Sequence, residues 1–128
     1  MLAQLDPEEH GSRTLHWSNA GHPPPVLLAP DGSVRLLETR PETLLGVRGA
    51  VRRTDHTVQL VPGASVVLYS DGLVERRGAT LDDGLNELTR VLDGCAGLTA
   101  EQLCDHLLTH LAADTEDVVV LAVVRARG

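Results

Sequence analysis

Three groups of polar residues lie where the sequence predicts that a strand meets a loop. They occupy positions 19–22 (Asn-Ala-Gly-His), 69–75 (Tyr-Ser-Asp-Gly-Leu-Val-Glu) and 114–117 (Asp-Thr-Glu-Asp). Mg²⁺ and Mn²⁺ take oxygen ligands in strict geometry, so rigid strand ends are favourable places for their carboxylate ligands. Carboxylates from two neighbouring strand ends can converge on one ion. Metal binding is therefore the chemistry that these groups could support.

Each group also has a purely structural interpretation. Asn19 and Gly21 tolerate positive φ and prolines follow, so the first group can be a tight turn, and His22 alone is more often a satisfied polar residue than a ligand or base. Asp71 before Gly72 can equally be a turn initiator. Acidic residues before a strand are commonly solvated loop. The residue types alone leave both interpretations open.

Composition excludes several classes of protein. The chain of 128 residues is 42% hydrophobic and 23% charged, ordinary values for one soluble domain or a piece of one. A net charge of −7 and 2% aromatic residues argue against nucleic-acid binding, which needs phosphate neutralisation and base stacking. Cys95 and Cys104 have no ligand spacing and are expected to be free thiols. No apolar stretch is long enough for a bilayer and no signal peptide is visible, so a cytoplasmic location is expected.

The chain has no lysine and no isoleucine, and all eleven of its basic residues are arginine. This usage has no evident physical advantage. It is typical of GC-rich coding and indicates a bacterial protein.

Hydrophobic periodicity predicts an α+β domain. Strands are expected at positions 1–5, 14–18, 26–29, 34–37, 51–60 and 65–69, joined by short turns such as Pro-Asp-Gly at 30–32, which favours an antiparallel sheet. Leucines at helical spacing predict a first helix from Leu81 to Leu92, and Thr99 with Gln102 predicts a capping box that starts a second. A final strand at 117–125 is expected to be buried on both faces.

In this order the motifs resemble a known family. The segments SNAGHPPPVLLAPDG, LLGV, VPGASVVLYSDGLVE and EDVVVLAVVR are similar to the protein phosphatase 2C-type (PPM) family, in its stage II sporulation protein E branch. The resemblance runs from Met1 to about Arg125. It implies an antiparallel β-sandwich flanked by helices, of which residues 1–128 form the C-terminal portion of a single domain. Such a domain is expected to be incomplete at its N-terminus.

The resemblance also implies a function. Family members use two Mn²⁺ or Mg²⁺ ions, which hold a water that attacks the phosphorus of a phosphoserine or phosphothreonine in a protein substrate. In this branch the expected substrate is a phosphorylated anti-anti-sigma-type regulator, so the expected role is sigma-factor regulation. No separate catalytic residue is expected beyond the metal site.

The family's site residues transfer to particular positions of this chain. Asp71 matches the metal-binding Asp of the strand-end motif. Glu116 aligns with the last metal-binding Asp and Asp117 with the residue after it, a departure because Glu is one methylene longer. The resemblance further implies substrate or loop positioning by four other residues, namely Asn19, Gly21, His22 and Gly72.

One family motif has no counterpart in the sequence. An Asp-x-x-Gly-His-Gly segment, whose Asp bridges both metals in the family, is not matched. The alternative is therefore a non-catalytic, truncated or pseudo-phosphatase fragment, which would bind metal weakly or not at all. Such a fragment would expose a sheet face through which it could associate. A third hypothesis sets the resemblance aside and makes the chain a small α+β ligand-binding module, with a pocket away from Asp71.

Overall fold

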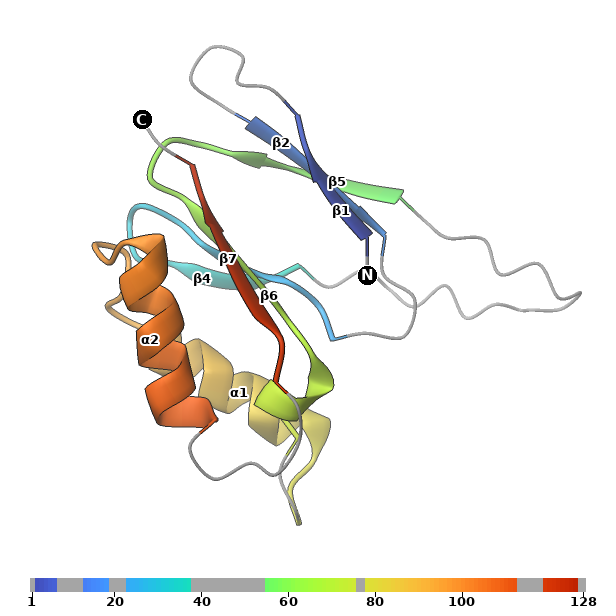
Figure 1. Ribbon diagram of the computed structural model, residues 1–128, viewed down its shortest axis with the longest axis vertical. Coiled ribbons are helices and arrows are strands. Elements are labelled where there is room, and N and C mark those ends of the chain that lie inside the picture. Colours follow the sequence, from blue (N-terminus) through green and yellow to red (C-terminus); the bar gives the residue numbers. More distant parts are fainter. Residues whose placement is uncertain are drawn as a thin grey trace, which may run out of the picture.

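Two antiparallel sheets stack face to face in the computed structural model, and two helices cover the outer face of one of them (Figure 1). The structure describes residues 2–6, 13–18, 23–37, 55–75, 78–112 and 119–126. The predicted class, an α+β antiparallel sandwich flanked by helices, is confirmed.

The first sheet has the order β1-β2-β5. Its strands are β1 (Leu2–Leu5), β2 (Arg13–Ser18) and β5 (Asp55–Leu60). In β2 the side chains of Leu15 and Trp17 are buried while those of Thr14 and His16 are half-buried, which is the alternation predicted for this segment. Of the strand expected at 51–60, the structure describes Asp55–Leu60 as β5, and residues 51–54 lie outside the described part.

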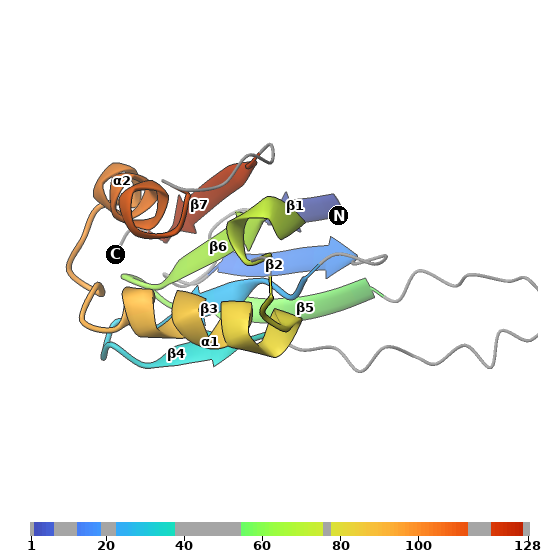
Figure 2. The same cartoon turned by 90° about the horizontal axis from the view of Figure 1, so that it is seen from below.

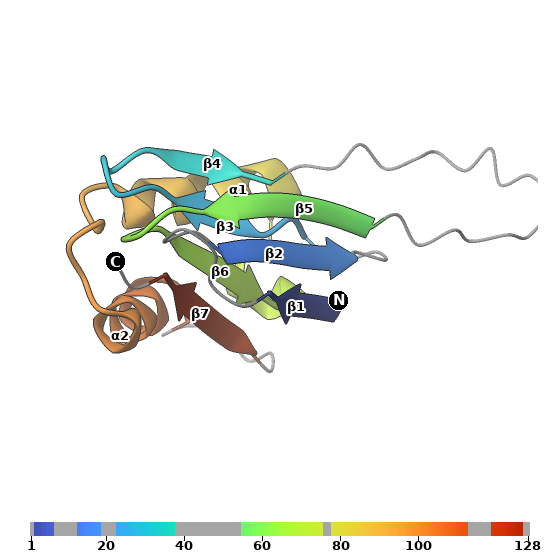
Figure 3. The same cartoon turned by 90° about the horizontal axis from the view of Figure 1, so that it is seen from above.

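The second sheet has the order β4-β3-β6-β7 and lies between the first sheet and the helices (Figures 2 and 3). Its strands are β3 (Val26–Leu28), β4 (Val34–Leu36), β6 (Ser65–Tyr69) and β7 (Leu121–Arg125). A tight turn joins β3 to β4. There Gly32 adopts a φ of 93°, which glycine accepts readily, and the Asp31 carboxylate accepts a hydrogen bond of 2.9 Å from the Ser33 amide. The predicted hairpin is confirmed.

The prediction of a final strand buried on both faces was wrong. β7 has Ala122 exposed and its other residues only half-buried. Within the described residues β7 pairs with β6 alone, so it is an edge strand and one flank stays open. A run of valines suits a half-buried edge as well as a central position, and the sequence could not separate the two. Residues 117 and 118 lie outside the described part.

Both helices begin at capping boxes. Thr80 precedes α1 (Leu81–Leu92), where its hydroxyl accepts from the Asp83 amide at 3.1 Å and the Asp83 carboxylate accepts from the Thr80 amide at 3.0 Å. Thr99 and Gln102 make the same reciprocal pair before α2 (Ala100–Leu111). These bonds satisfy amides that a helix start leaves without partners. The box predicted at Thr99 is confirmed.

The two helices are joined by a contact at the C-terminal end of α1. The carbonyl oxygen of Val91 lies 2.9 Å from His106 Nε2 of α2 and 3.3 Å from the Cys95 thiol. It belongs to the last turn of α1, whose carbonyls have no partners within the helix. Both cysteines are free, as predicted.

Buried side chains form two layers. The larger layer lies between the second sheet and the helices and includes Val67, Leu73, Leu88 and Leu107. The smaller one lies between the two sheets around Leu15 and Trp17. Of the helices that the structure describes, none combines the length and the apolar character needed to cross a membrane.

Candidate metal centre

Asp71 stands at the point where β6 ends and the chain turns. Ser70 is still extended, and a 3₁₀ turn follows at Asp71–Leu73. The carbonyl of Ser70 accepts from the Leu73 amide at 3.1 Å, and the carbonyl of Asp71 accepts from the amides of Val74 and Glu75. These bonds hold the backbone of Asp71 while its side chain remains exposed. A rigidly mounted, accessible carboxylate is what a hard cation requires.

Buried side chains hold the Asp71–Leu73 turn against the core. Leu73 and Val74 are almost fully buried and belong to the core under the helices. Gly84 of α1 approaches them so closely that a Cβ at that position would lie 1.9 Å from the Val74 carbonyl oxygen. Only glycine permits this approach of the helix to the turn.

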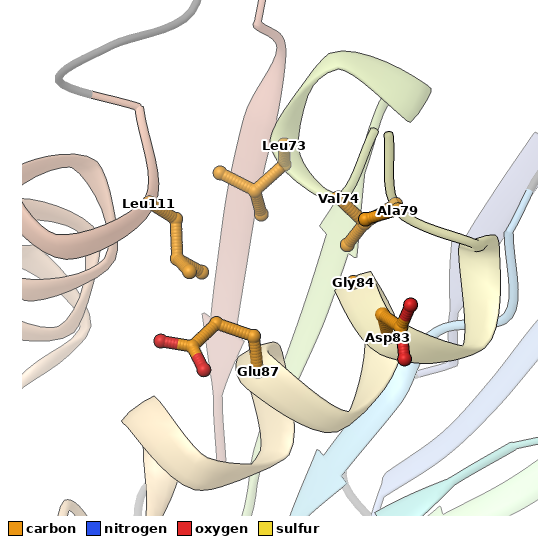
Figure 4. Close-up of a pocket in the computed structure, with 7 residues that line it drawn as sticks. All are labelled: Leu73, Val74, Ala79, Asp83, Gly84, Glu87 and Leu111. Carbon is orange, nitrogen blue, oxygen red and sulfur yellow. The ribbon is translucent and has the colours of Figure 1, made fainter. Parts of the chain in front are cut away.

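A small cavity lies beside this contact, between the turn, α1 and the end of α2 (Figure 4). It measures about 70 Å³ and is lined by Leu73, Val74 and Leu111, with the carboxylates of Asp83 and Glu87 at its side. Carboxylates repel phosphate, so this cavity is unsuited to a phosphorylated side chain. It lies against the Asp71–Leu73 turn rather than away from it, which does not meet the expectation for an independent ligand-binding module.

The start of the last strand is attached next to Asp71. The Ser70 amide donates to the Val120 carbonyl at 2.9 Å, and the Val120 amide donates to the Ser70 hydroxyl at 2.8 Å. Glu116 and Asp117, four and three residues before Val120 in the sequence, lie outside the described residues. The expected meeting of their carboxylates with Asp71 therefore stays a prediction.

Of the other predicted site residues, one lies within the described residues and three lie outside them. Asn19, Gly21 and His22 also lie outside the described residues, between the end of β2 and Pro23. Gly72 is described and is buried within the 3₁₀ turn after Asp71. The structure thus places Asp71 and Gly72 next to each other in one turn, and the roles expected for all of these residues stay predictions.

Tyr69 begins the second polar group and is a neighbour of the site, but the sequence reasoning assigned no role to it. Its side chain is 5% exposed, and its hydroxyl has no hydrogen-bond partner in the described part of the chain. Burial, and secondarily the negative charge of Asp71, raise the pKa of Tyr69 above its ordinary value. Alternation along β6 could have signalled that Tyr69 points to the same side as buried Val67.

The described residues supply one carboxylate of the predicted metal set. No three side chains of His, Cys, Asp or Glu gather within these ranges at positions suited to hold a metal ion. Asp71 itself fits the chemistry, because it is an exposed oxygen donor on a fixed strand end. The remaining candidates, Glu116 and Asp117, are outside the described part.

Comparison with known proteins identifies the family. Residues 1–127 match the family described as Stage II sporulation protein E (SpoIIE), and the chain belongs to it. Solved structures that resemble it include phosphatase domains of the PP2C type. The resemblance to the stage II sporulation protein E branch of the PPM phosphatases is thereby confirmed.

Two solved structures illustrate the likeness. The RsbU and RsbW domains of Rv1364c from Mycobacterium tuberculosis match with 27% identity and a TM-score of 0.68, over 92% of this chain and 34% of theirs. The phosphatase domain of the cell-fate determinant SpoIIE from Bacillus subtilis matches in fold, with 17% identity and a TM-score of 0.59, over 99% of this chain and 58% of its own. The chain thus spans between about a third and three fifths of these matched chains.

Proposed function

We propose that this chain is the C-terminal portion of a metal-dependent protein serine/threonine phosphatase domain. Its membership of the SpoIIE family supports a phosphatase. The single structural observation that carries the proposal is the position of Asp71, an exposed carboxylate at the end of β6 whose neighbour Ser70 is bonded to the residue that precedes β7. The start of β7 therefore lies beside Asp71, the residue that matches a metal-binding Asp of the family motif, and this supports the proposal.

Covalent geometry supports the second half of the site. Consecutive Cα atoms are about 3.8 Å apart, so the Cα of Asp117 can be no more than ~11 Å from that of Val120. Glu116 is one residue further. We propose that Glu116 supplies the carboxylate opposite Asp71, with Asp117 as the alternative if the register shifts by one residue. The extra methylene of Glu116 moves its carboxylate by about an ångström and would weaken an octahedral Mg²⁺ or Mn²⁺ site.

The chemistry would be hydrolysis of a phosphoserine or phosphothreonine in a protein. When bound, a pair of Mn²⁺ or Mg²⁺ ions supplies the attacking water and neutralises the phosphoryl oxygens. The chain's own residues would hold that arrangement, with Asp71 as a ligand and Gly72 as a positioning residue in the turn that follows β6. Asn19, Gly21 and His22 are proposed to position the substrate or its loop. The proposed substrate is a serine-phosphorylated anti-anti-sigma-type regulator in a bacterial cytoplasm.

The test compares two matched Asp→Asn changes in the protein at its natural full length. Asp71→Asn removes a ligand, whereas Asp31→Asn changes an exposed residue of the β3–β4 turn and keeps the oxygen that accepts from Ser33. We expect Asp71→Asn to lower Mn²⁺-dependent hydrolysis of a phosphoserine peptide at least about 100-fold, and Asp31→Asn to leave it unchanged. Full activity of Asp71→Asn would show that Asp71 is not a ligand.

A second candidate is a non-catalytic fragment. The absence of an Asp-x-x-Gly-His-Gly segment from the sequence favours it for residues 1–128 taken alone, because Asp71 with Glu116 or Asp117 lacks the bridging carboxylate of the family. The two candidates differ in one assay. If the full-length protein hydrolyses the peptide and residues 1–128 do not, the site is completed elsewhere; if neither does, the protein is a pseudo-phosphatase.

A further inference from the structure

At the junction between β6 and β7, the amides of Leu73 and Val120 would both use the Ser70 carbonyl as their acceptor. β6 and β7 pair antiparallel up to Tyr69 opposite Leu121, so the next opposed pair is Ser70 and Val120. In a regular ladder such a pair exchanges two backbone bonds. The first is present, from the Ser70 amide to the Val120 carbonyl at 2.9 Å. The second would need the Ser70 carbonyl.

That carbonyl is already in use. It accepts from the Leu73 amide at 3.1 Å, because the chain turns into the 3₁₀ segment directly after Ser70. The Val120 amide instead donates to the Ser70 hydroxyl at 2.8 Å. The hydroxyl thus stands in for the backbone acceptor that the turn has removed.

We propose that Ser70 is a positioning residue for the metal centre, acting through this substitution. Its carbonyl starts the turn that presents Asp71, and its hydroxyl keeps the chain before β7 attached at the same point. One residue thereby fixes the position of Asp71 relative to Val120, the residue that precedes β7. The inference rests on the proposed function, since it concerns the geometry of that same site.

The chemistry of position 70 predicts which residues can serve. The position needs an acceptor one bond from Cβ and an extended backbone, here φ −87° and ψ 164°. Threonine meets both needs, because β-branched residues favour extended backbone. Alanine leaves the Val120 amide to water, since the Val120 side chain is 62% exposed and does not cover it. Of the two hydrogen bonds described between Ser70 and Val120, only the one from the Ser70 amide would then remain.

The first measurement concerns the attachment alone, without metal. Amide hydrogen exchange is followed at Val120 in the full-length protein and in three variants, Ser70→Ala, Ser70→Thr and Ser33→Ala. Ser33→Ala is the matched control because it truncates an exposed serine in the β3–β4 turn. We expect Val120 exchange to be at least about tenfold faster in Ser70→Ala only. Unchanged exchange in Ser70→Ala would overturn the proposal.

The second measurement is Mn²⁺ affinity by calorimetry in the same proteins and in Asp71→Asn. We expect Ser70→Ala to bind about tenfold more weakly, as is usual when a partner of a ligand-bearing segment is lost, and Ser70→Thr and Ser33→Ala to bind as the parent does. If Asp71→Asn loses Mn²⁺ and Ser70→Ala does not, the positioning role is wrong and the metal site stands. If neither variant alters binding, the metal site itself is wrong and the inference falls with it.

Discussion

The two buried layers of the molecule differ in how completely they are closed. Among the described residues, fourteen buried side chains form the layer between the second sheet and the helices, against six in the layer between the sheets. The helix layer is covered by α1 and α2, and the inter-sheet layer is bordered by β1, where Ala3 and Gln4 are exposed. Stability is therefore expected to come mainly from the helix side, which also supports the Asp71–Leu73 turn.

Equal truncations in the two layers should show the contrast most strongly. Leu88 of α1 is fully buried, and Leu88→Ala is expected to lower the free energy of unfolding by about 4 kcal/mol, because surrounding atoms on all sides keep the cavity open. Leu15→Ala in β2 should cost about 2 kcal/mol, because a layer with an open border can collapse or admit water. Urea denaturation measures both. Equal losses would mean that the two layers are equally closed.

A side chain larger than glycine at position 84 should push α1 away from the turn after β6. Gly84→Ala places a Cβ against the Val74 carbonyl oxygen, and is expected to cost about 3 kcal/mol as α1 is displaced. Gly97→Ala is the matched control, because a Cβ there meets nothing within 4 Å. Thermal unfolding of both variants tests the contact. A Gly84→Ala protein as stable as the control would show that α1 does not press on the turn.

Removing the buried Tyr69 hydroxyl should stabilise the layer between the second sheet and the helices. Tyr69→Phe deletes a hydroxyl without a partner among the described residues and is expected to stabilise the protein by about 1 kcal/mol at neutral pH. The folded state raises the pKa of Tyr69, so the folded protein holds that proton at pH values where the unfolded chain releases it. The cost of burying Tyr69 is therefore smallest below about pH 10 and grows as pH rises further, so the protein loses stability. Tyr69→Phe should flatten that alkaline loss, which denaturation at pH 7 and pH 11 can measure.

The open flank of β7 should produce the smallest effect. Val120 is exposed, and β7 is an edge strand in the described part of the chain. Residues 1–128 in isolation are therefore expected to self-associate weakly, to an extent that grows with protein concentration. Val120→Lys places a charge at that edge and should make the free energy of association less favourable by about 1 kcal/mol or less. Sedimentation velocity over a concentration series checks it. A chain that stays monomeric at all concentrations would contradict an exposed association surface.

Sequence patterns predicted the parts of the fold that depend on local chemistry. Residues close together in the sequence determine three of these features: the leucine spacing of α1, the capping box at Thr99 and the Asp31-Gly32 turn. The motif around Asp71 also identified a strand end that the structure reproduces.

The contacts of Gly84 and Ser70 could not be predicted because they form only in the packed fold. Gly84 has the sequence context of an ordinary helix glycine, and its contact with Val74 exists only once the helix is docked. The same is true of the Ser70 hydroxyl, whose partner is fifty residues away in the chain. Burial of β7 was mispredicted because a valine run is equally suited to the middle and the edge of a sheet.

The pairing of β6 with β7 joins segments far apart in the sequence, from Ser65 opposite Arg125 to Tyr69 opposite Leu121. Each helix between them carries its own start signal and can form from nearby residues, whereas this strand pair must close a loop of about fifty residues. We expect the helices to form first and β7 to dock last. During synthesis, Asp71 would then leave the ribosome well before β7, so the ends of the two strands could meet only once β7 has also emerged.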